Sequence, residues 1–170
     1  SRLSGAMGYL TLLFKNGRYL TFGSLLTCLG TLGSGYFVGL FNRDIRHEFG
    51  LSHADIGLIF SITTVASGPF LIWLGRKIDE VDLRFYTVSL CLGFAVGCFL
   101  LASSATVIAV GAGIFLVRLI GDWLLVHTAV TSMARHFGAQ RGRAMGLGAI
   151  GYAVGPAVFP VMAVLFMSWV

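Results

Sequence analysis

The run "TVIAVGAGIFLVRLIGDWLLVHTAVT" (106–131) decides the fold class, because it is almost continuously apolar over a membrane-spanning length. A bilayer core of about 30 Å requires about 20 apolar residues of α-helix. Further segments of this kind lie at roughly 19–41, 54–75, 85–103 and 144–168. Only helices and closed barrels cross lipid with their backbone satisfied, and barrel strands are shorter and alternate in polarity. We therefore expect an all-α integral membrane protein, a helical bundle of five transmembrane helices.

The composition supports this class and excludes others. The 170 residues are 56% hydrophobic and 11% charged, whereas soluble domains carry about 25% charged residues. The net charge of +5 raises nucleic acid as a partner, but the basic residues lie between apolar runs rather than in a stripe with interleaved aromatics. We exclude nucleic-acid binding. The three cysteines lack metal-ligand spacing, so we expect no metal and no cofactor.

Basic residues gather on one side of the expected spans, and they predict the orientation. They precede the first span and fill the loops after the second and fourth: Lys15, Arg18, Arg76, Lys77, Arg84, Arg135, Arg141 and Arg143. By the positive-inside rule the N-terminus is cytoplasmic, and we expect a bacterial inner membrane. The chain starts at Ser1 and stops at Val170 within an apolar run, so we expect part of a longer protein.

Local patterns predict how the spans begin, bend and pack. "SHAD" (52–55) is a capping box that would start the second span. Proline at positions 69, 156 and 160 predicts kinks or local unwinding. Small residues recur every fourth position in the first span, and such stripes let helices approach closely in lipid: Gly23, Thr27, Thr31, Gly35 and Gly39. The stripes serve either static packing or seams along which helices rock.

The fourth span carries the candidate site. Arg118 and Asp122 are one helical turn apart and can pair, although each costs roughly 2.5–3.5 kcal/mol at the centre of a membrane helix. They either neutralise each other within the bundle or face a cavity that passes substrate or protons. His127 is a further candidate closer to the cytoplasm, and Tyr36 either lines the same cavity or packs ordinarily.

The loop "GRKIDEVDLR" (75–84) resembles the signature loop of the major facilitator superfamily. Gly75, Arg76, Asp79 and Arg84 match its glycine, aspartate and basic positions, whereas acidic residues stand where a basic residue and a glycine are usual. Two further matches follow in order along the chain. Residues 118–137 resemble the family's fourth helix, with Arg118 matching and 122–123 departing from it, and residues 141–160 resemble its fifth. There "GYAVGP" (151–156) is close to an antiporter motif, through Gly151, Gly155 and Pro156.

The resemblance implies the first of two six-helix halves, without its sixth helix and with the C-terminal half absent. It implies a secondary transporter that moves a small solute by alternating access, an organic anion or a drug-like molecule, with proton coupling as one option. Asp79 would help lock the cytoplasmic side, whereas the loop's basic residues serve either this gate or topology alone. The alternative is a membrane scaffold or sensor that retains the fold. An intramembrane enzyme is not expected, because no catalytic constellation is present.

Overall fold

The computed structural model describes residues 2–169, with side chains for 14–138 and 140–169. Within that range the chain is helical and contains no strand. Four helical spans are long and apolar enough to cross a membrane: His53–Lys77 (α4), Leu83–Ala102 (α5), Val107–Phe137 and Arg141–Met167. A fifth consists of Phe14–Gly39 and Asn42–Phe49 (α3), which are bent by 56°. The expected all-α membrane bundle is confirmed.

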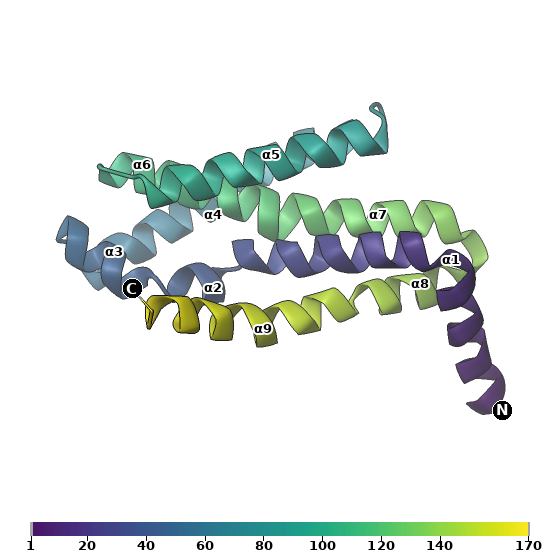
Figure 1. Ribbon diagram of the computed structural model, residues 1–170. Coiled ribbons are helices and arrows are strands. Elements are labelled where there is room, and N and C mark those ends of the chain that lie inside the picture. The colour runs from purple at the N-terminus through teal and green to yellow at the C-terminus, as the bar shows by residue number, and fades with distance from the viewer. Residues whose placement is uncertain (1, 170) are drawn as a thin grey trace.

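The first span is not the single helix expected over 19–41. Helix α1 (Arg2–Gly30) bends at Asn16, where φ is −129° and ψ is 28°, and its N-terminal arm turns away from the bundle (Figure 1). A 3₁₀ turn, η1 (Thr31–Gly33), follows; Ser34 is extended, and the short helix α2 (Gly35–Gly39) resumes. Glycines at positions 30, 33, 35 and 39 lower the helix propensity of this stretch. The break could not be predicted from the apolar residues, because they continue on both sides of it.

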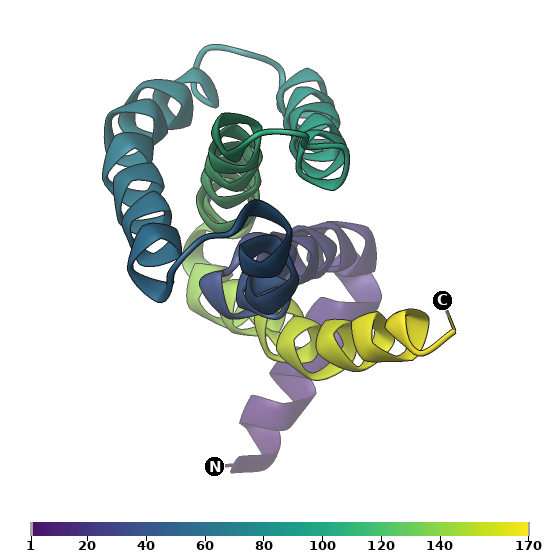
Figure 2. The ribbon, with the colours of Figure 1, turned by 90° about the vertical axis from the view of Figure 1, so that its left-hand side faces the viewer.

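The fourth span is the centre of the bundle. It consists of α6 (Val107–Val117), the π-helix η2 (Arg118–Leu125) and α7 (Val126–Phe137). In its apolar window 44% of the residues are buried, against 11–22% in the other three long spans. It contacts the first, second and third spans, and the end-on view shows it between α4 and α5 (Figure 2). Its candidate residues therefore lie at the middle of the molecule.

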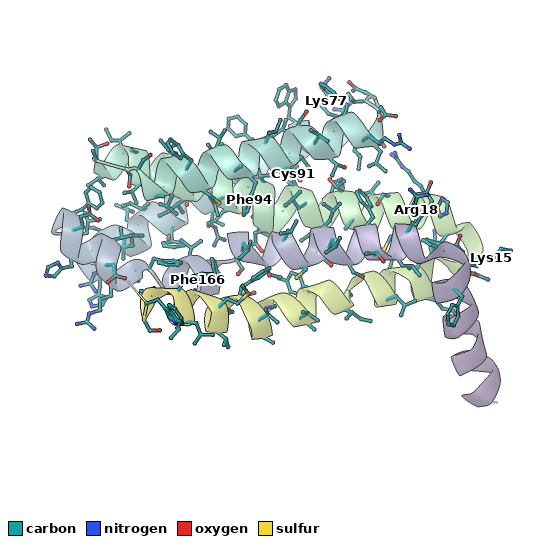
Figure 3. The ribbon with its side chains drawn as sticks, in the orientation of Figure 1. Lys15, Arg18, Lys77, Cys91, Phe94 and Phe166 are labelled. Atoms are coloured by element: carbon teal, nitrogen blue, oxygen red, sulfur yellow. The ribbon has the colours of Figure 1, made fainter. Side chains whose placement is uncertain are left out.

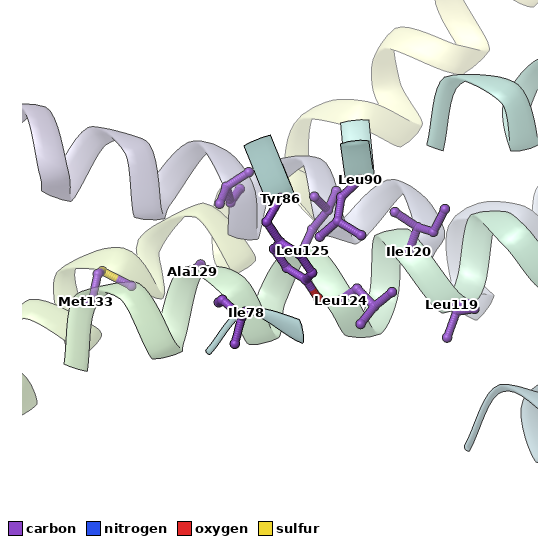
Figure 4. Packing of buried hydrophobic residues seen from close by; sticks show 10 residues of the cluster. Ile78, Tyr86, Leu90, Leu119, Ile120, Leu124, Leu125, Ala129 and Met133 are labelled. Carbon is purple, nitrogen blue, oxygen red and sulfur yellow. The ribbon is translucent and has the colours of Figure 1, made fainter. Parts of the chain in front are cut away.

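The main core forms around this central span. Its buried members come from the first, third and fourth spans and the loop at 78–82: Leu26, Ile78, Tyr86, Leu90, Leu119, Ile120, Leu124, Leu125, Ala129 and Met133. Figure 4 shows Tyr86 of α5 reaching the central helix beside Leu124 and Leu125. The Tyr86 hydroxyl donates to the carbonyl oxygen of Leu74 at 2.9 Å, so this polar group is satisfied and ties α5 to α4.

The fifth span is interrupted at Ala149, between α8 (Arg141–Gly148) and α9 (Ile150–Met167). The carbonyl oxygens of Leu147 and Gly148 accept hydrogen bonds from the hydroxyls of Ser24 (3.2 Å) and Thr27 (2.7 Å) on α1. Lipid offers no water to polar groups at such an irregularity. The two hydroxyls of the first span therefore add hydrogen bonds at the break and hold the two spans together.

Local unwinding is not found at the prolines. Helix α4 continues through Pro69, and α9 continues through Pro156 and Pro160. This part of the prediction is wrong, because a membrane helix tolerates the loss of one hydrogen bond when its neighbours stabilise it. The capping box is confirmed: the Ser52 hydroxyl accepts from the Asp55 amide at 3.1 Å, and the Asp55 carboxylate accepts from the Ser52 amide at 2.8 Å.

Replacement of Thr27 by valine is expected to lower the free energy of unfolding by about 1 kcal/mol, because the Gly148 carbonyl would lose its buried partner. Unfolding in mixed detergent–SDS micelles measures the change. Ser89→Ala is the matched control, since its exposed hydroxyl donates only to Phe85 of its own helix. Equal losses in the two variants would contradict the role assigned to the contact between the spans.

Most basic residues outside the core lie at one end of the bundle, hereafter the basic end. Helix α3, which carries Arg43 and Arg46 together with Asp44 and Glu48, lies at the other end (Figure 1). Lys15, Arg18 and Lys77 are labelled at the basic end in Figure 3. Tyr19 of α1 stacks on His136 of α7 with ring centroids 3.6 Å apart, which ties the first and fourth spans at this end. The 3₁₀ turn η3 (Gly138–Gln140) then leads into α8.

Candidate functional site

The Arg118 guanidinium is largely buried in the core with few partners for its N–H donors. The side chain is 11% exposed, and a guanidinium nitrogen lies 3.7 Å from a carboxylate oxygen of Asp122, an ion pair longer than a hydrogen bond. Its Nε is buried without a partner, and Phe60 lies below the guanidinium at 5.8 Å. Arginine carries five N–H donors, and among the described residues none of them has a hydrogen-bond acceptor. The group is thus positioned for an acceptor that the described residues do not supply.

The π-helix places Arg118 and Asp122 beside the break in the first span. A Cβ built on Gly33 would lie 2.6 Å from the Asp122 amide nitrogen and 2.8 Å from the Gly121 Cα. Gly35 faces Arg118 in the same way, since a Cβ on this glycine would lie 2.9 Å from a guanidinium nitrogen. At Gly33 only glycine permits this approach, because the neighbouring atoms belong to the backbone, whereas at Gly35 the long Arg118 side chain can shift. Two irregular segments therefore meet at the ion pair, and π-helical turns are frequent at functional sites.

A groove of about 810 Å³ leads from Asp122 toward the basic end. Its lining comes from α4 and the loop after it, η2, α7 and α9, and its polar members are Arg76, Asp79, Asp122, Trp123, His127 and Tyr152. The His127 imidazole lies beside Gly75, whose backbone leaves room for the ring. The groove can accept a solute of small-molecule size, since ligand sites typically measure about 300–1,000 Å³.

At the mouth of this groove Asp79 forms an ion pair with Arg135, at the end of α7. A second guanidinium nitrogen of Arg135 donates to the carbonyl oxygen of Ile78 at 3.3 Å. The Asp79 and Arg135 side chains are 62% and 52% exposed, and exposed pairs contribute about 0–1 kcal/mol. The pair thus fastens the loop to the fourth span weakly enough to open.

Asp79→Asn is expected to reduce stability by less than about 1 kcal/mol, because the lost ion pair is exposed. If the pair is part of a gate, the same substitution lowers transport at least tenfold. The two readouts are unfolding in mixed micelles and solute uptake into proteoliposomes. Glu80→Gln, which breaks the neighbouring pair with Lys77, is the control, and equal transport by both variants would argue against a gate at Asp79.

Of the eight residues predicted for the substrate site and the gating loop, five line the groove and three do not. Asp122 and His127 share the groove with Gly75, Arg76 and Asp79. Tyr36, in α2, is 46% exposed and is not among the residues that line the groove. Arg118 lies one turn deeper than Asp122, at the π-helix start. Arg84 lies apart, in a hollow next to α1.

Gly151 and Gly155 lie where the fifth span packs on the first. A Cβ on Gly151 would collide with the carbonyl oxygen of Ser24, and one on Gly155 with the hydroxyl of Thr31. Pro156 follows directly, inside α9. These positions keep the helices close, so their place in the structure is that of packing residues rather than of groove lining.

Sequence reasoning missed Tyr152 and Arg135. Tyr152 lines the groove together with residues of the fourth span, and its one signal in the sequence was a phenol within the glycine-rich motif at 151–156. Arg135 was assigned to topology alone, although a basic residue in the last helical turn next to an acidic loop is a possible ion-pair partner. In both cases the functional contact joins residues that are far apart in the chain. The spacing of apolar residues within one helix does not predict such a contact.

Comparison with known families agrees with the motifs. The family model described as Major Facilitator Superfamily matches residues 5–170. Comparison with curated proteins and with solved structures gives no match. The family match covers almost the whole chain, including the loop at the mouth of the groove and the π-helix.

Proposed function

Because the chain belongs to the Major Facilitator Superfamily, a family of membrane transporters, we propose that it is part of a secondary transporter of small organic anions. The observation that carries this proposal is the buried Arg118 guanidinium, whose donors have no hydrogen-bond acceptor among the described residues. A carboxylate or phosphate on the solute would supply charge-assisted, bidentate acceptors. Transporter families of this kind are generally not enzymes, and Arg118 here acts by binding.

The groove supplies the proposed route. A solute enters at the basic end, passes His127 and Tyr152, and reaches Asp122 at the inner end of the groove. Binding at Arg118 loosens the 3.7 Å ion pair with Asp122, and the released carboxylate can then take up a proton. Occupancy and protonation would thereby be linked, which is the proposed basis of coupling.

Alternating access is the proposed mechanism, because irregular backbone of two spans meets at the candidate site. Transporters bind substrate near the bilayer midplane at discontinuous helices, and one bundle rocks against another. The interrupted first span and the π-helix of the fourth meet beside Arg118, and the weak Asp79–Arg135 pair lies at the groove mouth. We propose that the second bundle is a C-terminal half of the same protein, with the basic end in the cytoplasm of a bacterial cell.

Uptake by the complete protein in proteoliposomes tests this function. Radiolabelled monocarboxylates, dicarboxylates and organic phosphates are compared with organic cations of similar size, with and without an imposed proton gradient. Faster uptake of one anion class than in protein-free vesicles supports the proposal. Uptake confined to cations contradicts the anion assignment, and no uptake of any solute favours the scaffold or sensor alternative. A response to the gradient decides the coupling.

A further inference from the structure

A second hollow at the basic end, of about 490 Å³, lies between α1 and α5 and shares no lining residue with the groove. Its lining is Arg18, Tyr19 and Phe22 from the first span, and Asp82, Leu83 and Arg84 from the start of the third. Figure 3 shows Arg18 at the same end of the bundle as Lys77. Arg84 is the signature-loop residue that the groove does not use, so its position requires a separate account.

The charges around this hollow leave its two arginines without a carboxylate of their own. Each acid of the loop is engaged: Asp79 pairs with Arg135, and Glu80 pairs with Lys77 at 2.6 Å. The hydrogen bond from Lys77 holds the pKa of the Glu80 carboxyl below its usual value, so this acid stays charged and paired at neutral pH.

Asp82 is the one acid in the hollow, and it caps α5. One of its oxygens accepts from the amides of Arg84 and Phe85 at 2.8 and 3.4 Å. Arg18 and Arg84 form no ion pair with any described side chain. Two cations and one anion line the hollow, so its net charge is positive.

The depth of the hollow matches lipid headgroups. Leu83 begins a membrane-spanning helix, so the hollow lies where that span leaves the water. Tyr19 is 46% exposed there, and tyrosines gather at membrane–water interfaces. Phe22 and Leu83 offer an apolar wall below the arginines. Guanidinium groups bind phosphate bidentately, and basic pockets between membrane helices recognise anionic headgroups.

We propose that this hollow binds one anionic phospholipid, with Arg18 and Arg84 donating to its phosphate and an acyl chain lying against Phe22 and Leu83. The apolar wall selects a lipid over free phosphate. The net positive charge favours an anionic headgroup over a zwitterionic one, because two arginines face the single carboxylate of Asp82, and one oxygen of that carboxylate already caps α5. The site is independent of transport, since none of its residues lines the groove.

Native mass spectrometry of the complete protein, titrated with phosphatidylglycerol, tests the site. We expect one lipid to bind at least tenfold more tightly than phosphatidylcholine or phosphatidylethanolamine. Removing both charges in an R18Q/R84Q variant should weaken binding about 25-fold, at about fivefold per basic residue. The K15Q/R141Q variant is the matched control, since it removes the same charge from exposed positions at the same end, and it should change binding less than threefold.

Several outcomes would overturn the proposal. Equal losses in the two double variants would mean diffuse attraction rather than a site. Equal affinity for all three lipids would exclude recognition of an anionic headgroup. Competition by millimolar inorganic phosphate would assign the hollow to a free anion. Should R18Q/R84Q fail to fold, R18K and R84K keep the charge but lose the bidentate fork, and each is expected to weaken binding about threefold.

Discussion

Replacement of Gly33 by alanine is expected to reduce the free energy of unfolding by about 3 kcal/mol, the upper range for overpacking a tight core. The added methyl would lie 2.6 Å from the Asp122 amide nitrogen and 2.8 Å from the Gly121 Cα, and would also collide with the Val117 carbonyl oxygen. All three are backbone atoms of the fourth span. No rotamer change relieves such contacts, so the first span must separate from the fourth.

The same substitution at Gly39 is the matched control. This glycine ends α2 of the same span, and a Cβ there meets nothing within 4 Å, so Gly39→Ala should change stability by no more than a few tenths of a kcal/mol. Unfolding of the complete protein in mixed detergent–SDS micelles measures both. Gly121→Ala, which would meet Gly33 at 2.9 Å from the other side, should match Gly33→Ala. Similar stabilities for Gly33→Ala and Gly39→Ala would show that the spans part easily here.

The class of fold follows from the sequence because lipid imposes a length and a composition. A helix that crosses about 30 Å of hydrocarbon must be apolar over about 20 residues, and this constraint fixes the spans without reference to their neighbours. The capping box at 52–55 was equally local, since its donors and acceptors are contained in one short stretch. Such features are determined by residues that are close in the chain.

The breaks in the spans could not be predicted in the same way. Proline was the expected breaker, yet the fifth span is interrupted at Ala149, next to carbonyls that accept hydrogen bonds from hydroxyls of the first span. The π-helix at Arg118–Leu125 likewise depends on the glycine contact between the first and fourth spans. Both irregularities are stabilised by groups more than eighty residues away in the chain, as the separation of 121 residues between Thr27 and Gly148 illustrates. The helix propensities of the residues at these positions therefore do not predict the two irregularities.

The candidate site was predictable by residue type but not by arrangement. Charges in an apolar helix identify Arg118 and Asp122 because their burial is costly. The groove that joins Asp122 to Asp79 requires α4, α7 and α9 to converge, and the motifs do not specify that convergence. Arg84 is a second example. The motif assigns it to the gating loop, but in the structure it lines a hollow next to α1 instead of the groove.

Replacement of Arg118 by lysine is expected to reduce uptake of the anionic solute about 100-fold while leaving membrane insertion intact. Insertion costs are similar for the two residues at a helix centre, roughly 2.5–3.5 kcal/mol. Binding differs, because lysine lacks the planar fork that holds a carboxylate bidentately. Lost charge-assisted hydrogen bonds of about 1.5–3 kcal/mol correspond to about 10- to 150-fold. Uptake into proteoliposomes measures the loss, with Arg141→Lys at an exposed position of the basic end as the control.

A second variant distinguishes a role of Arg118 in solute binding from a purely stabilising role of its ion pair with Asp122. The double substitution R118Q/D122N removes both charges of the 3.7 Å pair, so it leaves no uncompensated ion in the core and should fold and insert at least as well as the native chain. If the pair only stabilises the bundle, this variant transports normally. If Arg118 binds the solute, the variant is stable but inactive, because the anion then meets no cation beside Phe60. Normal uptake by either Arg118 variant would remove this residue from the transport mechanism.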